Sequence, residues 1–382
     1  MDVDIAQLDS LLEEASQLRA SDVHVAVGEA PRARIDGALR LLAGHPLPVD
    51  AEWLERAITR ILPPRDIDAV RLESEIDFSH DVPGVGRFRV SVYRQLGQVA
   101  AAFRLIPEKA ASLRELGLPP IARDLALRPR GLVFVTGPTG SGKSTTLSAM
   151  VDEINNAIPS HIITLEDPIE FIHRSRVAMI HQREIGSDTA SFAEGLRRVL
   201  RQDPDVILIG ELRDPESISV ALSAAETGQL VLATLHTQGA AKSINRILDA
   251  FPAHQQAQIR TQLSETLQGV ISQTLLPLAQ SEGRVLATEV LVNTAAVANL
   301  IREGQVQQLT SAMQSGSSVG MHTMDQSLRA LVESGTVSLH AARASVVDRH
   351  ALDGVTVRPR DLDAEAWSVR ASDHSLSGWG RR

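Results

Sequence analysis

The residues best suited to chemistry lie in a glycine-rich stretch, GPTGSGKST, at 137–145. It matches the pattern G-x-x-x-x-G-K-[ST] and follows an apolar run at 132–135. In such a loop, backbone N–H groups and a helix N-terminus surround an oxyanion, the lysine reaches the outer phosphates and the hydroxyl holds Mg²⁺. We therefore expect phosphates to be bound by Gly137, Pro138, Thr139, Gly140, Ser141, Gly142, Lys143, Ser144 and Thr145.

Carboxylates follow two further apolar segments. IITLEDPIEF at 162–171 ends in Glu166, Asp167 and Glu170, and DVILIGELRD at 205–214 delivers Glu211. A phosphate site needs acids that hold Mg²⁺ and its waters and one acid that orients the attacking water. Taken alone, the first segment is equally consistent with a solvated acidic turn. A buried structural strand explains the apolar part of the second segment but not the acid at its end.

A histidine ends another apolar segment, QLVLATLHT at 229–237. A single histidine such as His236 is more often structural than catalytic. However, ligands of open α/β sheets gather at the carboxyl ends of the strands, where the loop and the acids are also expected. A polar donor at that edge favours a sensor of the γ-phosphate.

Composition argues against several other classes of protein. The chain has 382 residues, enough for about two or three domains. No segment approaches the roughly 18 apolar residues of a membrane span, and the acidic start lacks the features of a signal peptide. With no Cys, the chain can form neither disulfides nor a thiolate zinc site. The net charge of −9 and the 3% of aromatic residues disfavour nucleic-acid binding. We expect a cytoplasmic protein without a membrane span.

Hydrophobic periodicity predicts the elements of an N-terminal domain at 1–107. Apolar residues recur at helical spacing over 5–18, and β-patterned segments flank the turn signal Asp36-Gly37. A second hairpin is expected across 83–86, and a further strand at 98–107. These elements indicate a small α+β domain built on an antiparallel sheet.

A different pattern begins at 131. The apolar strands LVFVTG, HIITLED, DVILIGE and QLVLATLH alternate with helical segments, which predicts an α/β domain with a parallel sheet over 131–350. We interpret 108–130 as a connector with some helix and 254–350 as mostly helical. The polar tail at 351–382 is predicted to be disordered.

In this order, the motifs resemble the secretion ATPase superfamily and most closely its PilT branch, the type IV pilus retraction ATPases. Four segments carry the resemblance: GPTGSGKSTTL as the P-loop, ITLEDPIEF as the Asp box, ILIGELRD as the Walker B strand and AAETGQLVLATLHT as the His box. ASDVHV and the RFRV…FRLIP pair look like the N-terminal PAS-like domain of the family, and ANLIREG and GMHTMDQSL like its C-terminal helices. The resemblance covers about 1–350. It implies that a RecA-like ATPase domain with C-terminal helices follows a PAS-like domain.

The resemblance also implies individual roles in the hydrolysis of ATP. Lys143 would bind the β- and γ-phosphates, and Ser144 would hold Mg²⁺. Glu170 would position the attacking water, and Glu211 would support Mg²⁺ and that water. His236 would sense the γ-phosphate.

Three further positions come from the same resemblance. Glu166 would be a ligand of Mg²⁺ beside Ser144 and Glu211. Arg89 and Arg104, on strands of the N-terminal domain, would reach into the active site of a neighbouring subunit in a homo-hexamer.

The implied function is an ATPase motor that powers pilus retraction and twitching motility. It would act from the cytoplasmic face of the inner membrane on a platform protein of the pilus, with a paralogous retraction ATPase as a second partner. Pilus-assembly and type II secretion ATPases resemble it but usually add a four-Cys zinc element and a longer N-terminal region, and this chain has no Cys.

Two positions depart from the pattern of the family. Gln229 replaces the first histidine of the His box, and Ala298 replaces an arginine in the segment that ends in NLIRE. A slow accessory or regulatory ATP-binding paralogue therefore stays open as an alternative.

Overall fold

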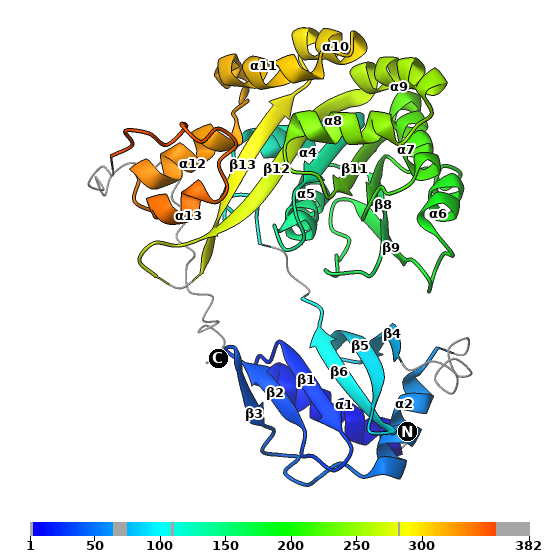
Figure 1. Ribbon diagram of the computed structural model, residues 1–382. Helices are drawn as coiled ribbons and strands as arrows, with labels where there is room; N and C mark the ends of the chain where they lie inside the picture. The colour runs from blue at the N-terminus through cyan, green and yellow to red at the C-terminus, as the bar shows by residue number, and fades with distance from the viewer. Residues whose placement is uncertain (1–2, 64–74, 108–110, 282, 357–382) are drawn as a thin grey trace. The chain divides into compact units, whose positions relative to one another are not determined.

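The computed structural model describes residues 3–63, 75–107, 111–281 and 283–356. The chain divides into two compact units, 1–108 and 109–382. Both can be followed in Figure 1, where the first is drawn in blue and cyan. No helix among the described residues is both long and apolar enough to cross a membrane.

Unit 1 is an antiparallel sheet covered by two helices. Its six strands lie in the order β3-β2-β1-β6-β5-β4. Helices α1 and α2 bury Leu8, Leu12, Leu54 and Ile58 against strand residues such as Phe103. The elements are α1 (Val3–Gln17), β1 (Asp22–Ala26), β2 (Arg32–Ile35), β3 (Ala38–Leu41), α2 (Ala51–Ile61), β4 (Glu75–Val82), β5 (Gly86–Gln95) and β6 (Gln98–Leu105).

The two predicted hairpins of unit 1 are present. Asp36 and Gly37 both have positive φ, 49° and 79°, between β2 and β3. Consecutive positive φ angles match the twist of a two-residue hairpin, and this favours Asp-Gly. Residues 83–85 join β4 to β5. The α+β fold predicted for the first hundred residues is confirmed.

Unit 2 is built on a seven-stranded sheet in the order β13-β12-β7-β11-β10-β8-β9. All neighbours are parallel except β12 and β13. The parallel strands therefore end at one edge of the sheet, which is where the sequence motifs lie. The strands are β7 (Gly131–Thr136), β8 (His161–Glu166), β9 (Met179–Glu184), β10 (Val206–Ile209), β11 (Leu230–Leu235), β12 (Leu267–Pro277) and β13 (Arg284–Val292).

Helices cover both faces of this sheet, as the α/β prediction requires (Figure 1). Helices α4 and α5 pack together on one side, and α6, α7, α8 and α9 form a contiguous layer with each other. The apolar interior between these layers includes Phe134, Leu147, Ile207, Leu232 and Val270. The bounds are α4 (Ile121–Ala126), α5 (Lys143–Ala157), α6 (Phe192–Val199), α7 (Pro215–Thr227), α8 (Ala240–Asp249) and α9 (Ala253–Thr266).

The expectation of a mostly helical 254–350 is wrong for its central part. Residues 267–277 and 284–292 form β12 and β13, which extend the sheet beside β7. Both strands are buried on two faces for most of their length, so apolar residues do not alternate with polar ones. Helices do follow: α10 (Ala295–Arg302), α11 (Leu309–Ser315), α12 (Met324–Glu333) and α13 (Leu339–Arg343).

The segment at 111–130 packs into the core of unit 2. Leu113, Leu118 and Leu125 are buried there with the sheet. The predicted disorder of 351–382 falls mostly on 357–382, which lies outside the described residues. Residues 351–356 are described, and Leu352 is buried against α12 and α13.

Candidate active site

The glycine-rich loop joins β7 to α5 at the carboxyl edge of the sheet. Gly137 has a φ of 146°, and a Cβ there would lie 2.4 Å from the carbonyl oxygen of Gln273 on β12. Gly142 begins α5 with a φ of 87°, in the left-handed region. Because glycine has no Cβ, it tolerates both the close approach at position 137 and the left-handed backbone at position 142. The loop therefore passes close to β12 and exposes its N–H groups in front of the helix.

The side chain of Lys143 is folded back onto this loop. Its Nζ donates hydrogen bonds to the carbonyl oxygens of Gly137 and Pro138, both at 3.0 Å. Only 8% of the residue is exposed. Burial lowers the pKa of Lys143, and Glu211 and Glu170 oppose that effect. Because a buried cation is costly unless it is paired, phosphate oxygens are suitable partners for this ammonium group.

Glu211 and His236 connect the Walker B strand to this lysine. The Oε1 atom of Glu211 lies 3.0 Å from Nε2 of His236, and Nδ1 of His236 lies 3.5 Å from Nζ of Lys143. An ionised carboxylate only accepts, so Nε2 donates and Nδ1 faces the lysine as an acceptor. His236 therefore bridges Glu211 and Lys143 through its two ring nitrogens.

The charge of Glu211 is held by its neighbours. Arg213 lies 2.6 Å from Oε2 of Glu211. Burial opposes ionisation, but Arg213 and His236 outweigh it and hold the pKa of Glu211 below its ordinary value. Glu211 is therefore an anion at neutral pH, as a base or a partner of Mg²⁺ must be.

Glu170 lies beside the hydroxyl that the motif assigns to Mg²⁺. The Oγ atom of Ser144 donates to Oε1 of Glu170 at 3.0 Å. Glu170 is exposed, whereas Ser144 lies in the first turn of α5. The carboxylate thus projects into solvent next to the phosphate loop, where it can contact a water molecule.

Glu166 differs from the other acids. Its Oε1 accepts from Oγ1 of Thr164 at 2.6 Å and from Nε2 of Gln182 at 3.1 Å. Burial raises the pKa of Glu166, and these two hydrogen bonds only partly oppose it. Three side chains are expected around Mg²⁺, those of Ser144, Glu166 and Glu211. Of these, Glu166 is the least available as a direct ligand.

These residues line a cavity of about 600 Å³, a size suited to a nucleotide. Among the described residues, no cluster of three or more His, Asp and Glu could hold a metal by itself. Mg²⁺ usually binds one or two protein oxygens together with substrate phosphates. The donor set of Ser144 with Glu211 fits a Mg²⁺ ion that arrives with the nucleotide.

Arg89 and Arg104 lie in unit 1, directly opposite each other on β5 and β6. Arg104 lies 2.7 Å from Asp22, and Arg89 lies 3.2 Å from Asp77. Like charges directly opposite on neighbouring strands repel, so this pair of arginines requires neighbouring carboxylates to offset the repulsion. Burial raises the pKa of Asp22, but hydrogen bonds from Ser21 and Arg104 outweigh it and keep that pKa below the ordinary value.

Gln229 does not belong to the nucleotide cavity of its own chain. It precedes β11, and its Oε1 accepts from Oγ1 of Thr227 at 2.8 Å. His236 follows the other end of the same six-residue strand, about 20 Å away. A missing histidine at 229 therefore cannot weaken nucleotide sensing within the chain by direct contact.

Three residues of the site have no assignment from the sequence motifs. Gln182 of β9 donates to Glu166 and to the carbonyl oxygen of Phe171, so it fixes the Asp box. Arg213 and Arg284 add two guanidinium groups to the lining of the cavity. Arg213 lies within the Walker B segment ILIGELRD and could have been noticed, whereas Arg284 is 71 positions further on and carries no local signal.

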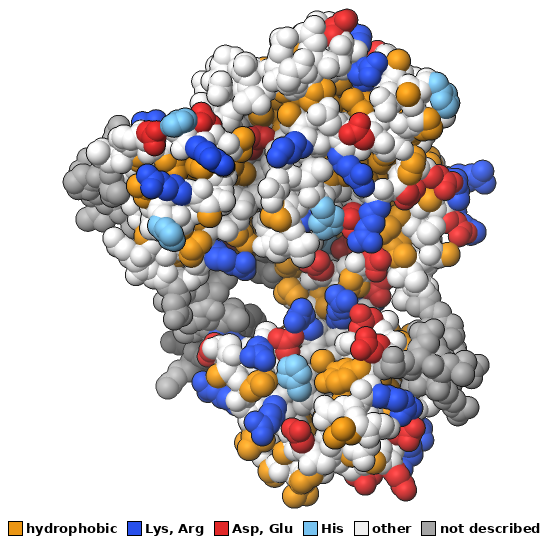
Figure 2. Space-filling model, viewed as in Figure 1, with side chains coloured by type: hydrophobic (Ala, Val, Ile, Leu, Met, Phe, Trp, Pro, Cys, Tyr) orange, Lys and Arg blue, Asp and Glu red, His pale blue; other side chains and the backbone are white. Residues whose placement is uncertain are grey.

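Basic and acidic side chains are interspersed over the face of the molecule in Figure 2. That face shows no continuous basic surface among its described residues, in keeping with the net charge of −9. An interspersed surface does not favour the long phosphate backbone of a nucleic acid.

The chain is similar to known proteins over most of its length. A family model described as "Type II/IV secretion system protein" matches residues 3–344. The type IV pilus retraction ATPase PilT of Pseudomonas aeruginosa is 47% identical over 336 residues, which are 88% of this chain and 97% of that protein. The type IV pilus ATPase PilU of the same organism is 38% identical, over 88% of each chain.

A solved structure agrees with these relatives. The crystal structure of the pilus retraction motor PilT with bound ADP superposes with a TM-score of 0.82 at 44% identity. The alignment covers 89% of this chain and 97% of that one. The likeness therefore extends across both units and is not limited to the P-loop.

Proposed function

The chain belongs to the family of type II/IV secretion system proteins and is an ATP hydrolase; we propose that it is the motor that retracts type IV pili. The observation that carries this proposal is the likeness to a pilus retraction ATPase over nearly the whole of that protein. The geometry of the nucleotide cavity supports it, because the phosphate loop, the acids and His236 line the same cavity.

In the proposed reaction, Lys143 exchanges its two backbone carbonyls for the β- and γ-phosphates of ATP. Ser144 and Glu211 would hold Mg²⁺ together with the phosphates, and Glu166, which lines the same cavity, would hold waters of that ion. Mg²⁺ supplies positive charge to the phosphoryl group during transfer. Glu170, which accepts from Ser144, orients the attacking water. His236 signals the presence of the γ-phosphate, because it contacts both Lys143 and Glu211.

The active unit in this proposal is a homo-hexamer in which Arg89 or Arg104 completes the site of a neighbouring subunit. Arginines supplied by a neighbour stabilise charge on the γ-phosphoryl group in other P-loop enzymes. Both arginines are at least 42% exposed in their side chains. Their bonds to Asp77 and Asp22 can therefore be exchanged for phosphate oxygens at modest cost.

The motor would act from the cytoplasmic face of the inner membrane on a platform protein at the base of the pilus. A paralogous retraction ATPase would be a second partner. Both assignments rest on the family alone. The proposal favours retraction over assembly or type II secretion because the chain has no Cys for the zinc element that those ATPases usually carry.

A slow accessory ATPase is the second candidate function. It is favoured by Ala298, which replaces an arginine of the family pattern on α10. This candidate predicts ATP binding with little turnover, and retraction that continues without the protein.

The test is deletion of the gene in its own host, followed by a measurement of twitching motility. Complementation with the wild-type gene should restore motility, and Lys143→Ala should not. Lys242→Ala is the matched control, because Lys242 is exposed on α8 and does not line the cavity. Deletion cells that keep normal twitching would contradict the motor and favour the accessory role.

A further inference from the structure

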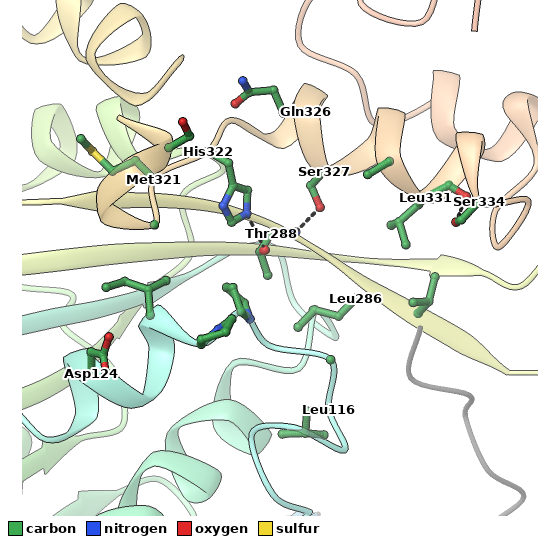
Figure 3. A pocket seen from close by; sticks show the side chains of 18 of the residues that line it. Leu116, Asp124, Leu286, Thr288, Met321, His322, Gln326, Ser327, Leu331 and Ser334 are labelled. Carbon is green, nitrogen blue, oxygen red and sulfur yellow. Dashed lines mark hydrogen bonds between the residues drawn. The ribbon is translucent and has the colours of Figure 1, made fainter. Parts of the chain in front are cut away.

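A second cavity, here called the β13 cavity, lies elsewhere in unit 2. Its volume is about 800 Å³, and its walls come from the segment 115–124, from β13 and from α12 with the turn before it. Figure 3 shows these three segments around the cavity. Protein interiors rarely contain voids much larger than a water molecule, whereas sites for small molecules occupy about 300–1,000 Å³. This cavity therefore has the size of a ligand site.

The walls of the β13 cavity are mostly apolar. Leu116, Pro119, Ile121, Leu286, Met321 and Leu331 contribute to them. Without a ligand, the apolar walls of the cavity are in contact with water, and this contact is unfavourable. A largely apolar molecule would remove that contact.

Polar groups converge at the middle of the cavity. Oγ1 of Thr288 lies 2.9 Å from Nε2 of His322, and the Thr288 N–H donates to Oγ of Ser327 at 3.1 Å. Figure 3 shows these side chains meeting across β13. Burial lowers the pKa of His322, although hydrogen bonds with backbone groups oppose it. The imidazole is therefore neutral, and the middle of the cavity carries no charge.

The charged residues of the lining are Glu115, Asp124 and Arg284. A Cβ on Gly320 would lie 2.9 Å from Cβ of Ile121, so the turn before α12 meets α4 and its Asp124 at one end. Thr288, which contacts His322 of the same turn, lies about 13 Å along β13 from Arg284. Arg284 is exposed and has no ion pair or side-chain hydrogen bond with any other described residue.

Arg284 and Leu275 belong to both cavities. They line the nucleotide cavity as well as the β13 cavity, and they lie on adjacent antiparallel strands. A group that binds Arg284 from one cavity changes the wall of the other. Because such coupling is reciprocal, each ligand would alter the affinity of the other.

From this arrangement we propose that the β13 cavity binds an elongated, largely apolar small molecule with one acidic group. The acidic group pairs with Arg284, the apolar body extends along β13, and Asp124 repels the opposite orientation. The ligand competes with the nucleotide for Arg284 and thereby weakens the binding of ATP.

The test uses one fluorescent probe and two competitors with the full chain. The fluorescence of anilinonaphthalene sulfonate, an apolar anion, is titrated and should saturate at one site per chain. Dodecanoate should displace it at lower concentration than dodecanol, which has the same chain without the charge. Equal displacement by the two would overturn the role of an acidic group.

Two variants locate the probe. Ala330 is exposed on α12 and lines the β13 cavity, so Ala330→Trp should weaken probe binding at least about tenfold while ATPase activity stays unchanged. Ala257→Trp, at an exposed position of α9 outside the cavity, should bind the probe as the wild type does. Equal binding by the two tryptophan variants would overturn the site.

A third variant tests the coupling. Saturating ATP with Mg²⁺ should weaken probe binding by about fivefold or more in the wild type. In Arg284→Gln, the probe should bind more weakly and no longer respond to ATP. An unchanged response to ATP in Arg284→Gln would overturn the competition for this arginine.

Discussion

The cluster of Lys143, His236 and Glu211 in unit 2 and the arginine pair of unit 1 are both made of cations beside carboxylates. The first is partly buried between parallel strands, and its members contact one another within 3.5 Å. The second is on an antiparallel sheet, with Arg104 68% exposed and Arg89 42% exposed in their side chains. The burial of Lys143, which is only 8% exposed, separates the two groups, because the side chain of His236 is itself 45% exposed.

This difference has consequences for function. A partly buried charge depends on its few partners, so removing one leaves the others uncompensated. An exposed pair is screened by water and contributes about 0–1 kcal/mol to stability, so its partners can be exchanged. The Lys143 cluster suits a preformed phosphate site, whereas the arginine pair suits a contact that forms and breaks with a neighbouring subunit.

The largest effect is expected from Lys143→Ala. Charge-assisted hydrogen bonds contribute about 1.5–3 kcal/mol each, so losing the contacts to two phosphates should weaken ATP binding at least about 100-fold. Turnover should become undetectable. Calorimetric titration with a non-hydrolysable ATP analogue measures the affinity, with Lys242→Ala as the control. An affinity within a few-fold of the wild type would contradict the placement of the phosphates.

Arg104→Ala should reduce kcat about 10³-fold with little change in ATP affinity, because an arginine finger acts mainly on the transition state. Steady-state ATPase assays and ATP-analogue titration give the two values. Arg40→Ala is the matched control, because Arg40 is exposed on β3 of the same sheet. Turnover at the wild-type rate would mean that Arg104 completes no site, and Arg89→Ala would then be tested in the same way.

Glu170→Gln should lower kcat about 10²-fold while ATP affinity stays near normal. Glutamine can still accept the hydrogen bond from Ser144, but it cannot take up a proton from water. Single-turnover hydrolysis separates this effect from product release, and Glu55→Gln, exposed on α2, serves as the control. Parallel losses of binding and turnover would assign Glu170 to the nucleotide rather than to the water.

Glu166→Gln should act on stability and its pH dependence. Burial raises the pKa of Glu166 in the folded protein, so the folded state holds this proton more tightly than the unfolded chain. The contribution of protonated Glu166 to the stability of the fold is therefore largest at pH values below the pKa of Glu166 in the unfolded chain. It is lost as pH rises through the pKa of Glu166 in the folded protein. The variant should melt about 2–4 °C higher than the wild type near pH 8, with a smaller difference near pH 5. Melting temperatures that change equally with pH in the variant and the wild type would refute this role of Glu166.

The smallest effect is expected from Gln229→His. Gln229 and His236 lie at opposite ends of β11, so KM and kcat should stay within about twofold of the wild type. A larger change in an assembled ring, absent from the monomer, would show that position 229 acts between subunits.

The motifs could be predicted from the sequence because each lies at the end of a recognisable element. The glycine loop, the acids and His236 all follow apolar strands, and parallel strands bring their ends to one edge. The hairpin at Asp36-Gly37 could be predicted because its backbone angles require particular residues.

The other features of the fold and the site depend on how the strands pair, and the sequence pattern does not reveal that pairing. Strands β12 and β13 lack alternation because they are buried on both faces, so 254–350 seemed helical. Strand β9 (MIHQRE) lies at the edge of the sheet and is polar, so it gave no signal, and its Gln182 was missed as well. Arg284 reaches the nucleotide cavity only because β13 pairs with β12.

We propose that ATP is hydrolysed at sites shared between subunits. It is tested most directly by co-expressing Lys143→Ala and Arg104→Ala chains with different tags and measuring ATPase activity in rings that carry both tags. Each variant alone should be inactive. A mixed ring contains interfaces that join an intact Lys143 site to an intact Arg104, about a quarter of all interfaces if mixing is random. If sites are shared, the mixed rings should show activity approaching that fraction of the wild-type rate. Mixed rings as inactive as either variant alone would contradict it.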